Sequence, residues 1–369
     1  MKKGISVITP TEGRPHLVKR LLFSLQKARE NFQGEVEIII IDSSEGPVAE
    51  EIQKTCLAHN ALYLRGTKSV REKRNLGIKQ AKFEIILCID SDCEADKDLL
   101  NQHFSTYERY PFVGGCAGVT LFRGERSWVW KILELTPFLD SFSFAAKYPY
   151  LMWAPCSNFS FKKSVIKDIG GFRTDWPFNL GGDDLDLTLR MTEKGFLIKG
   201  NKDAIVFHTT ETWNKLGAVV ERIWRWGRMS FHVAQAHPRL LYHDIPRFPI
   251  VFIFMVVIGL LFSLKQFFTG LAIPTIGLLS FWVFYAVVSR VLRNSSSPLL
   301  YVIISRIFIT IYEFGQVYES IKHKSVIMLF KRLTFSEDEI INEWGSEITY
   351  TWTLILTMVT LLVFIAYMV

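Results

Sequence analysis

The segment from Glu84 to Asp92 reads EIILCIDSD, and it decides the fold class. Its apolar run up to Ile89 is typical of a strand buried on both faces, and two carboxylates follow where the run ends. Residues i and i+2 of a strand lie on the same face, so Asp90 and Asp92 are predicted to point together into one crevice. This pattern favours a ligand site at one edge of a sheet.

Two interpretations of Asp90 and Asp92 are open at this point. In one, they are solvated aspartates in a polar turn. In the other, they hold a hard divalent cation together with diphosphate oxygens, because Mg²⁺ usually takes one or two protein carboxylates and leaves its other positions to phosphate and water.

The residues around this segment alternate between strand-like and helix-like patterns. The predicted elements are strands at Ile5 to Thr9, Glu35 to Ile41 and Ala61 to Leu64, and helices at Pro15 to Glu30, Val48 to His59 and Ser69 to Ala81. Such alternation predicts an α/β domain with a mostly parallel sheet and helices on both faces. Ligands of these sheets lie beyond the carboxyl ends of the strands, where Asp42, Asp90 and Asp92 are found.

Acidic residues gather a second time in the block from Gly181 to Arg190, which reads GGDDLDLTLR. Its glycines allow a tight loop, and the apolar residues after them predict a helix that begins near Asp183 or Asp184. The aspartates then either cap this helix and interact with its dipole, or include a general base. Neighbouring carboxylates raise the pKa of one another, which suits a group that takes a proton from a hydroxyl.

The composition of the chain changes after Pro246. Three nearly uncharged segments approach the roughly 20 residues that a helix needs to cross a bilayer: Pro249 to Leu264, Phe268 to Ser289 and Trp352 to Val369. Uncharged runs of this length rarely fit a globular core. The segment Leu299 to Ile321 carries Arg306, Glu313 and Glu319, so we expect an amphipathic or re-entrant element there, with a fourth spanning helix as the alternative.

The charge of the chain points to the same environment. The net charge is +7, and basic residues flank the apolar segments, which indicates anionic lipid headgroups as partners and no nucleic acid. No apolar leader follows Met1, so the N-terminal domain is expected in the cytoplasm. The five cysteines match no disulfide framework or zinc ligand set and are expected to be reduced and structural. We predict a soluble domain at residues 1–240 and a multi-pass membrane region at 241–369.

Several motifs occur in one order through the soluble domain, about two-thirds of the chain. They are Val7 to Arg14, Asp42, Arg74-Asn75-Leu76-Gly77, Asp90-Ser91-Asp92 and Gly182-Asp183-Asp184. In this order they resemble glycosyltransferase family 2, whose members have the GT-A fold, a Rossmann-like and mostly parallel sheet. The resemblance implies an inverting, metal-dependent glycosyltransferase.

The resemblance also implies a role for each matched residue. The residues implied to bind a nucleotide-sugar donor are Pro10, Glu12, Arg14, Asp42, Arg74, Asn75, Asp90, Arg225 and Trp226. The residues implied to hold Mg²⁺ or Mn²⁺ are Asp92, Asp90 and His208. Asp183 and Asp184 are implied to be the catalytic pair, with Asp184 as the base.

Three matches have a second interpretation. Arg222-Ile223-Trp224-Arg225-Trp226 stands where processive members have Gln-x-x-Arg-Trp, and an arginine in the glutamine position argues against a polymerase. Arg225 and Trp226 would otherwise lie on a helix near the membrane. A lone histidine such as His208 is more often a structural hydrogen-bonding group than a metal ligand.

Aromatic residues between Leu121 and Trp153 indicate either core or a membrane-interface surface.

These features together predict transfer of a sugar from a nucleotide-diphosphate donor to a lipid-linked or saccharide acceptor at the cytoplasmic membrane face. The apolar helices favour a lipid-linked acceptor, because a soluble donor alone has little need of them. The alternatives are a processive polysaccharide synthase, a non-catalytic nucleotide-sugar-binding membrane module, and a transporter gated by its soluble domain.

Overall fold

The computed structural model describes residues 3–176, 180–243, 247–293, 296–333 and 337–368. Contacts divide the chain into two compact units. The first consists of Met1–Arg126 and Leu139–Trp213, and the second of Ser127–Phe138 and Asn214–Val369. The second unit therefore begins before the predicted boundary near residue 240, and it includes a short segment taken from within the N-terminal half.

The first unit is built on a mixed sheet of nine described strands in the order β3-β2-β1-β4-β8-β6-β9-β5, with β7 also paired to β9. The strands are β1 Gly4–Thr11, β2 Glu35–Asp42, β3 Leu62–Arg65, β4 Ile85–Ile89, β5 Cys93–Ala95, β6 Gly115–Arg123, β7 Tyr150–Leu151, β8 Asn158–Lys162 and β9 Ile198–Thr209. Strands β3, β2, β1 and β4 are parallel, and each antiparallel pair described within this sheet involves β8 or β9. The predicted α/β class is confirmed.

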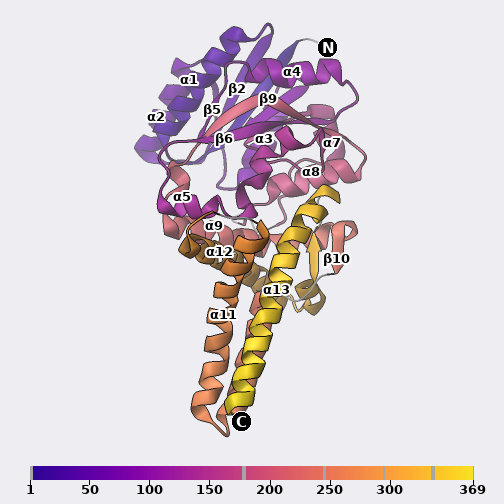
Figure 1. The fold of residues 1–369 in the computed structure, drawn as a ribbon. Coiled ribbons are helices and arrows are strands. Elements are labelled where there is room, and N and C mark those ends of the chain that lie inside the picture. The colour runs from indigo at the N-terminus through magenta and orange to yellow at the C-terminus, as the bar shows by residue number, and fades with distance from the viewer. Residues whose placement is uncertain (1–2, 177–179, 244–246, 294–295, 334–336, 369) are drawn as a thin grey trace. The chain divides into compact units, whose positions relative to one another are not determined.

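Helices cover both faces of this sheet (Figure 1). They are α1 Pro15–Asn31, α2 Gly46–Ala58, α3 Val70–Gln80, α4 Leu99–Arg109, α6 Phe144–Lys147, α7 Lys163–Ile169 and α8 Asp183–Glu193. Alternate residues of a strand face opposite sides, so Ile38 and Ile40 of β2 pack in a core with α1, α2 and α4. Ile39 and Ile41 pack in a second core with α7 and α8.

Helix α1 shows how the sequence sets one of these contacts. Pro15 occupies the first turn, where its missing N–H costs nothing. The residues at helical spacing after it, Leu17, Leu21 and Leu25, are buried against the sheet as their pattern predicts. The preceding residue, Arg14, has a left-handed backbone with φ of 55°. This turn ends the loop that leaves β1.

The carboxyl ends of three strands meet at one edge of the sheet. Thr11 at the end of β1 pairs in register with Asp42 at the end of β2. Ile8 pairs with Cys88, so β4 ends close to the same level. The predicted site residues Glu12, Arg14, Asp90 and Asp92 lie in the loops that leave β1 and β4, which therefore start from a common edge, as expected for a parallel sheet.

Gly118 lies where the β6–β9 pairing changes register, and its backbone leaves no room for a side chain. A Cβ atom there would lie 2.3 Å from the carbonyl oxygen of Ala204 and 2.3 Å from Nδ2 of Asn158. We expect Gly118→Ala to destabilise the first unit by about 3 kcal/mol, because a backbone oxygen cannot move aside. Thermal unfolding in detergent should show a midpoint lowered by several degrees.

The matched control for this prediction is Gly217→Ala. A Cβ atom at Gly217 would have nothing within 4 Å. Gly217 also lies in a helix, where alanine is favoured over glycine. Equal midpoints for the two variants would contradict the close approach at Gly118.

The second unit consists mainly of helices. They are α5 Trp128–Leu133, α9 Leu216–Ala236, α10 Phe248–Ser263, α11 Phe267–Arg293, α12 Leu299–Lys322 and α13 Glu337–Met368, with a small antiparallel pair of β10 Leu241–His243 and β11 Lys331–Leu333. Helices α10, α11 and α13 share apolar contacts, among them the stacked rings of Phe248 and Phe281, whose centroids are 3.7 Å apart. Short 3₁₀ helices occur in both units, at Pro137–Ser143, Glu211–Trp213, Pro238–Leu240 and Val326–Phe330.

Three described helices are long and apolar enough to cross a membrane, namely Phe267–Leu292, Leu299–Lys322 and Thr349–Met368. The number matches the predicted three spans, but the set differs. Helix α10 has 16 residues and is about 24 Å long, shorter than the roughly 30 Å hydrocarbon core. Helix α12 is long and apolar enough by its length and composition, and within it Arg306 and Glu313 are buried and pair with each other at 2.7 Å. This pairing lowers the cost of two of the three charges that argued against a span.

Candidate active site

The carboxylate of Asp42 is fully buried and organises the loop after β2. Its Oδ1 accepts hydrogen bonds from the N–H of Ser44 at 2.9 Å and from the Ser44 hydroxyl at 2.6 Å. Its Oδ2 accepts one from the Tyr63 hydroxyl at 3.0 Å. The Ser44 hydroxyl oxygen in turn accepts from the N–H of Gly13 at 2.7 Å, which ties this loop to the loop after β1. The donor-binding role of Asp42 stays a prediction, and Ser44 and Tyr63 join it as residues that the sequence did not single out.

Helix α3 carries buried basic side chains, two of which are Lys73 and Arg71. Lys73 lies beside the ends of β1 and β2, and Arg71 lies beside the residues that precede α8. Nζ of Lys73 donates to the carbonyl oxygen of Thr11 and to the hydroxyl of Ser43, both at 2.8 Å. Burial lowers the pKa of the Lys73 ammonium. Arg71 donates to the carbonyl oxygen of Gly181 at 2.6 Å, immediately before α8. The sequence shows that this helix is basic. A helical pattern does not show which of its basic side chains are buried.

Arg74 joins two of the predicted acidic motifs. Its buried guanidinium donates to the carboxylate of Asp183 at the start of α8 and, at 3.0 Å, to Oδ1 of Asp90 after β4. Burial raises the pKa of Asp90, and the charge of Arg74 opposes that effect. Asp90 is thus held by Arg74, and it is not one of the described residues that converge with Asp92 as a group of potential metal ligands.

Asn75 fixes the loop that precedes the second acidic block. Its Nδ2 donates to the carbonyl oxygen of Phe172, and its Oδ1 accepts from the N–H of Phe172, both at 2.8 Å. Gly171 has a left-handed backbone, and a Cβ atom there would lie 2.8 Å from Oδ1 of Asn75. The Arg-Asn-x-Gly motif therefore positions a loop through Asn75, beside its predicted role under the donor.

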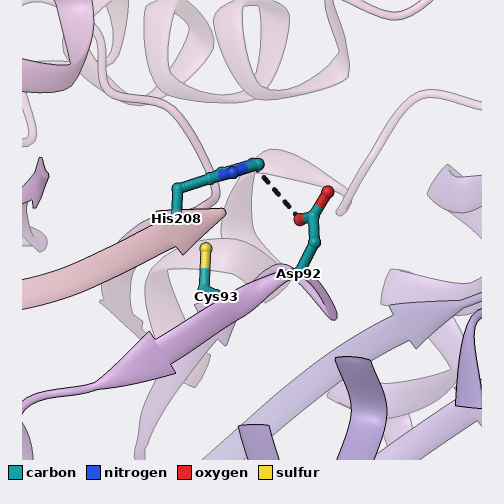
Figure 2. A group of neighbouring side chains, drawn as sticks. All are labelled: Asp92, Cys93 and His208. Atoms are coloured by element: carbon teal, nitrogen blue, oxygen red, sulfur yellow. Dashed lines mark ion pairs between the residues drawn. The ribbon is translucent and has the colours of Figure 1, made fainter. Parts of the chain in front are cut away.

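Asp92, Cys93 and His208 form a group of potential metal ligands whose ligand atoms all lie within 4.8 Å of one another (Figure 2). The antiparallel pairing of β5 with β9 sets Cys93 opposite His208. Nε2 of His208 lies 3.2 Å from Oδ1 of Asp92. Oδ2 of Asp92 lies 3.2 Å from Nη1 of Arg14 and accepts from the Thr212 hydroxyl at 3.2 Å.

The donor atoms of this group fit a divalent cation. Nδ1 of His208 lies 2.8 Å from the carbonyl oxygen of Thr209, so an Nδ1–H would donate there and leave the Nε2 lone pair for a cation shared with Asp92. Burial raises the pKa of the Cys93 thiol well above its usual range, so this sulfur is protonated as long as no cation is bound. One carboxylate with one imidazole suits Mn²⁺ at least as well as Mg²⁺.

Aromatic rings enclose His208. Its ring centroid lies 5.3 Å from that of Phe122, 6.4 Å from Phe142 and 5.9 Å from Trp213. Phe142 comes from the aromatic stretch between Leu121 and Trp153, and here it packs inside the first unit. These contacts restrict the rotation of the imidazole and leave its Nε2 edge toward Asp92.

The three aspartates of the second acidic block have different surroundings. Asp183 pairs with Arg74, and Asp186 is buried and pairs with Arg190 at 2.8 Å. Asp184 is half-buried, and its Oδ1 accepts one hydrogen bond, at 2.9 Å, from the N–H of Leu185. Burial, followed by the charge of Asp183, raises the pKa of Asp184 to about 6. Gly182 is the N-cap residue of α8, so none of the three aspartates occupies the capping position.

The remaining predicted residues fall in two places. Pro10 lies within β1 opposite Ile41, and Glu12 is exposed in the loop that follows. Arg225 and Trp226 lie on α9 in the second unit, where the Trp226 ring packs 5.8 Å from that of Phe138. The donor-binding roles of all four stay predictions.

An α/β sheet with carboxylates and buried cations collected beyond its strand ends has the chemistry to suit a phosphorylated ligand together with a divalent cation. Residues 6–170 match the model of the family described as glycosyl transferase family 2, and this segment is a domain of that family. The mixed sheet and its covering helices form a GT-A-like domain, as the resemblance implied.

Curated relatives of the chain are similar over this segment. A poly-β-1,6-N-acetyl-D-glucosamine synthase of Staphylococcus epidermidis is 29% identical over 147 residues, 38% of this chain and 36% of the relative. The enzyme of the same name from Staphylococcus aureus strain COL is 26% identical over 169 residues, 44% of this chain and 40% of the relative. The chain thus spans less than half the length of these relatives.

Two solved structures are more distant. The mannosyltransferase PcManGT from Pyrobaculum calidifontis, in complex with GDP-Man and Mn²⁺, has a TM-score of 0.48 and 16% identity over 89% of this chain and 86% of that one. Staphylococcus aureus TarS has a TM-score of 0.40 and 18% identity over 60% of this chain and 39% of that one.

Proposed function

We propose that the first unit transfers a sugar from a nucleotide-diphosphate donor to an acceptor hydroxyl with inversion. The observation that carries this proposal is Asp184, a half-buried carboxylate with a pKa of about 6 at the start of α8. A carboxylate with this pKa is largely ionised at pH 7 and is a stronger base than an ordinary aspartate. Asp184 lies in the same compact unit as most of the matched segment 6–170, and Asp92 within that segment belongs to a group of potential metal ligands, which supports the assignment.

In the proposed reaction, Asp184 accepts the proton of the acceptor hydroxyl, and the hydroxyl oxygen forms a bond to the anomeric carbon. The bond from that carbon to the diphosphate oxygen breaks, and the nucleoside diphosphate leaves with the electron pair. A single displacement inverts the configuration. Arg74 holds Asp183 beside the base, so Asp183 acts as a positioning residue. Asp92 and His208, with Asp90 nearby, would hold Mg²⁺ or Mn²⁺, which when bound neutralises charge on the departing diphosphate.

The loop after β1 contains Arg14, whose guanidinium can turn toward the donor. Arg14 pairs with Asp92 at 3.2 Å while its side chain is 42% exposed, so the guanidinium has room to turn toward another anion. Diphosphate oxygens bind a guanidinium well. Glu12, Pro10, Asn75 and Asp42 belong to the same proposed donor site.

We further propose a lipid-linked or saccharide acceptor at the cytoplasmic face of the cell membrane, with the second unit embedded among membrane lipids in a multi-pass arrangement. Three apolar helices of sufficient length support this location. A lipid-linked acceptor would explain why the chain has these helices, whereas a soluble donor would not. A processive polysaccharide synthase is the second candidate, because the curated relatives are named as synthases of a polymer.

The test is an assay of the full chain in detergent with a panel of nucleotide sugars, Mg²⁺ or Mn²⁺, and a membrane lipid extract as acceptor. The expected result is metal-dependent release of nucleoside diphosphate and one added sugar per acceptor. A ladder of products would favour the synthase. Donor binding without turnover for any sugar would overturn the enzyme proposal in favour of a non-catalytic binding module.

A further inference from the structure

A second group of potential metal ligands lies in the second unit, on helices that carry none of the residues just assigned to catalysis or to the cation. His232 comes from α9 and Glu319 from α12, whereas His323 is the C-cap residue of α12, four residues after Glu319. Their ligand atoms all lie within 4.8 Å of one another. Oε2 of Glu319 lies 3.2 Å from Nε2 of His323 and 3.6 Å from Nε2 of His232.

The carboxylate of Glu319 is fully buried, and its two oxygens have different surroundings. Oε1 accepts a hydrogen bond from Nε of Arg228 at 2.6 Å. Oε2 has no hydrogen-bond partner among the described residues, although two imidazole nitrogens lie within 4 Å of it. A buried carboxylate oxygen without a hydrogen bond is costly, and a cation between it and the imidazoles would remove that cost.

We propose that His232, Glu319 and His323 bind one transition-metal ion of the Zn²⁺ type, which fastens α9 to α12. Two imidazoles and one carboxylate are a known zinc ligand set that leaves a fourth position open. A tetrahedral ion about 2.0–2.2 Å from each ligand keeps neighbouring ligand atoms roughly 3.3–3.6 Å apart. The separations of 3.2 and 3.6 Å from Oε2 therefore agree with a shared ion.

The groups around the three ligands are compatible with an ion. Arg228 holds Oε1 of Glu319, which is the role that an outer hydrogen-bond donor has toward a metal-binding carboxylate. The Phe231 ring stacks on that of His323 with centroids 5.1 Å apart and fixes its orientation. The ammonium of Lys322 lies 3.9 Å from Oε2, but its side chain is 52% exposed and can turn to solvent.

Exposure makes one ligand suitable for replacement. The His323 side chain is 41% exposed, so the ion would reach the site from solvent, and loss of this imidazole leaves no buried cavity. Replacement of Glu319 would leave Arg228 without its partner and is less informative, because it threatens the packing of both helices.

The experiment uses the full chain in detergent, without a histidine tag, and with Asp92→Asn and His208→Ala included so that the cation group of the first unit is removed. Co²⁺ is titrated as a spectroscopic probe, and Zn²⁺ is then added as competitor. The expected result is one equivalent of Co²⁺ with the visible absorption of a four-coordinate site, displaced by Zn²⁺. Adding His323→Ala should weaken binding at least about tenfold, and adding His323→Cys should preserve it.

The control variant is His16→Ala, which removes a histidine whose side chain is 57% exposed in the first unit. It should leave the Co²⁺ spectrum and affinity unchanged. Absence of a bound equivalent in the parent protein, or equal affinities for the parent and its His323→Ala form, would overturn the proposal. In that case the two histidines would be packing and hydrogen-bonding groups around the Arg228–Glu319 ion pair.

Discussion

Replacing Asp184 with asparagine is expected to lower kcat for sugar transfer by about 10³-fold, because a general base contributes roughly 10²- to 10⁴-fold and an amide cannot accept the proton. The donor KM should change little, since asparagine keeps the size of the side chain and still offers an oxygen to the N–H of Leu185. Initial rates of product formation at saturating donor, together with donor titrations, measure both quantities.

The matched control is Asp168→Asn, the same chemical change at a side chain that is 58% exposed and pairs only at the surface with Lys194. Its kcat should equal that of the original protein. An Asp184→Asn variant that retained more than a tenth of the rate would remove Asp184 from the role of base.

The pH dependence of kcat is an independent test of whether Asp184 is the base. Burial raises the pKa of Asp184 to about 6, so the carboxyl is protonated below that pH and cannot accept a proton. We expect kcat to fall about tenfold per pH unit below 6 and to level off above 7. The residual rate of Asp184→Asn should lack this acidic limb, and a limb that persisted in the variant would belong to another group.

Asp92→Asn is expected to produce the second large loss, about 10²- to 10³-fold in turnover at a cation concentration that saturates the original protein. Asparagine removes the charge that faces Nε2 of His208, and a cation contributes several kcal/mol to stabilising a departing diphosphate. Raising the Mn²⁺ concentration should recover part of the rate, because the remaining ligands bind more weakly. Rates measured across a Mn²⁺ titration test both statements.

The control for this variant is Asp203→Asn, which changes an exposed aspartate within β9. Its cation dependence should match that of the original protein. His208→Ala should shift the Mn²⁺ titration in the same direction as Asp92→Asn. If His208→Ala left the titration unchanged while Asp92→Asn shifted it, His208 would have a structural role only.

The alternation of strands and helices could be predicted from the sequence because strands and helices have different hydrophobic periods. The contacts within the site could be predicted only in part. Asp90 and Asp92 were expected to point together by the i, i+2 rule, but β4 ends at Ile89 and the N–H of Cys93 closes a turn onto the carbonyl oxygen of Asp90. Side chains in that turn no longer follow strand alternation. Asp90 consequently faces Arg74, and Asp92 faces His208.

The partners of these aspartates depend on pairings between distant segments. His208 reaches Asp92 because β9 lies antiparallel to β5, and no local pattern in either strand specifies that register. The set of candidate membrane spans differed for another reason, which is local. Arg306 and Glu313 were each counted as an unpaired charge, although a spacing of seven residues, two turns of helix, brings them into contact.

The short helix α5 is synthesised well before the helix that it packs against. Trp130 is almost completely buried in the second unit, where α5 packs against α12, although the ribosome adds α12 long after α5. Until α12 leaves the ribosome, the apolar face of α5 has no partner from that helix and is exposed to chaperones, to the membrane surface or to aggregation. A polypeptide that stops at Trp213 would keep this exposed face permanently, so a soluble fragment of the first unit would need the segment Ser127–Phe138 replaced by a polar linker.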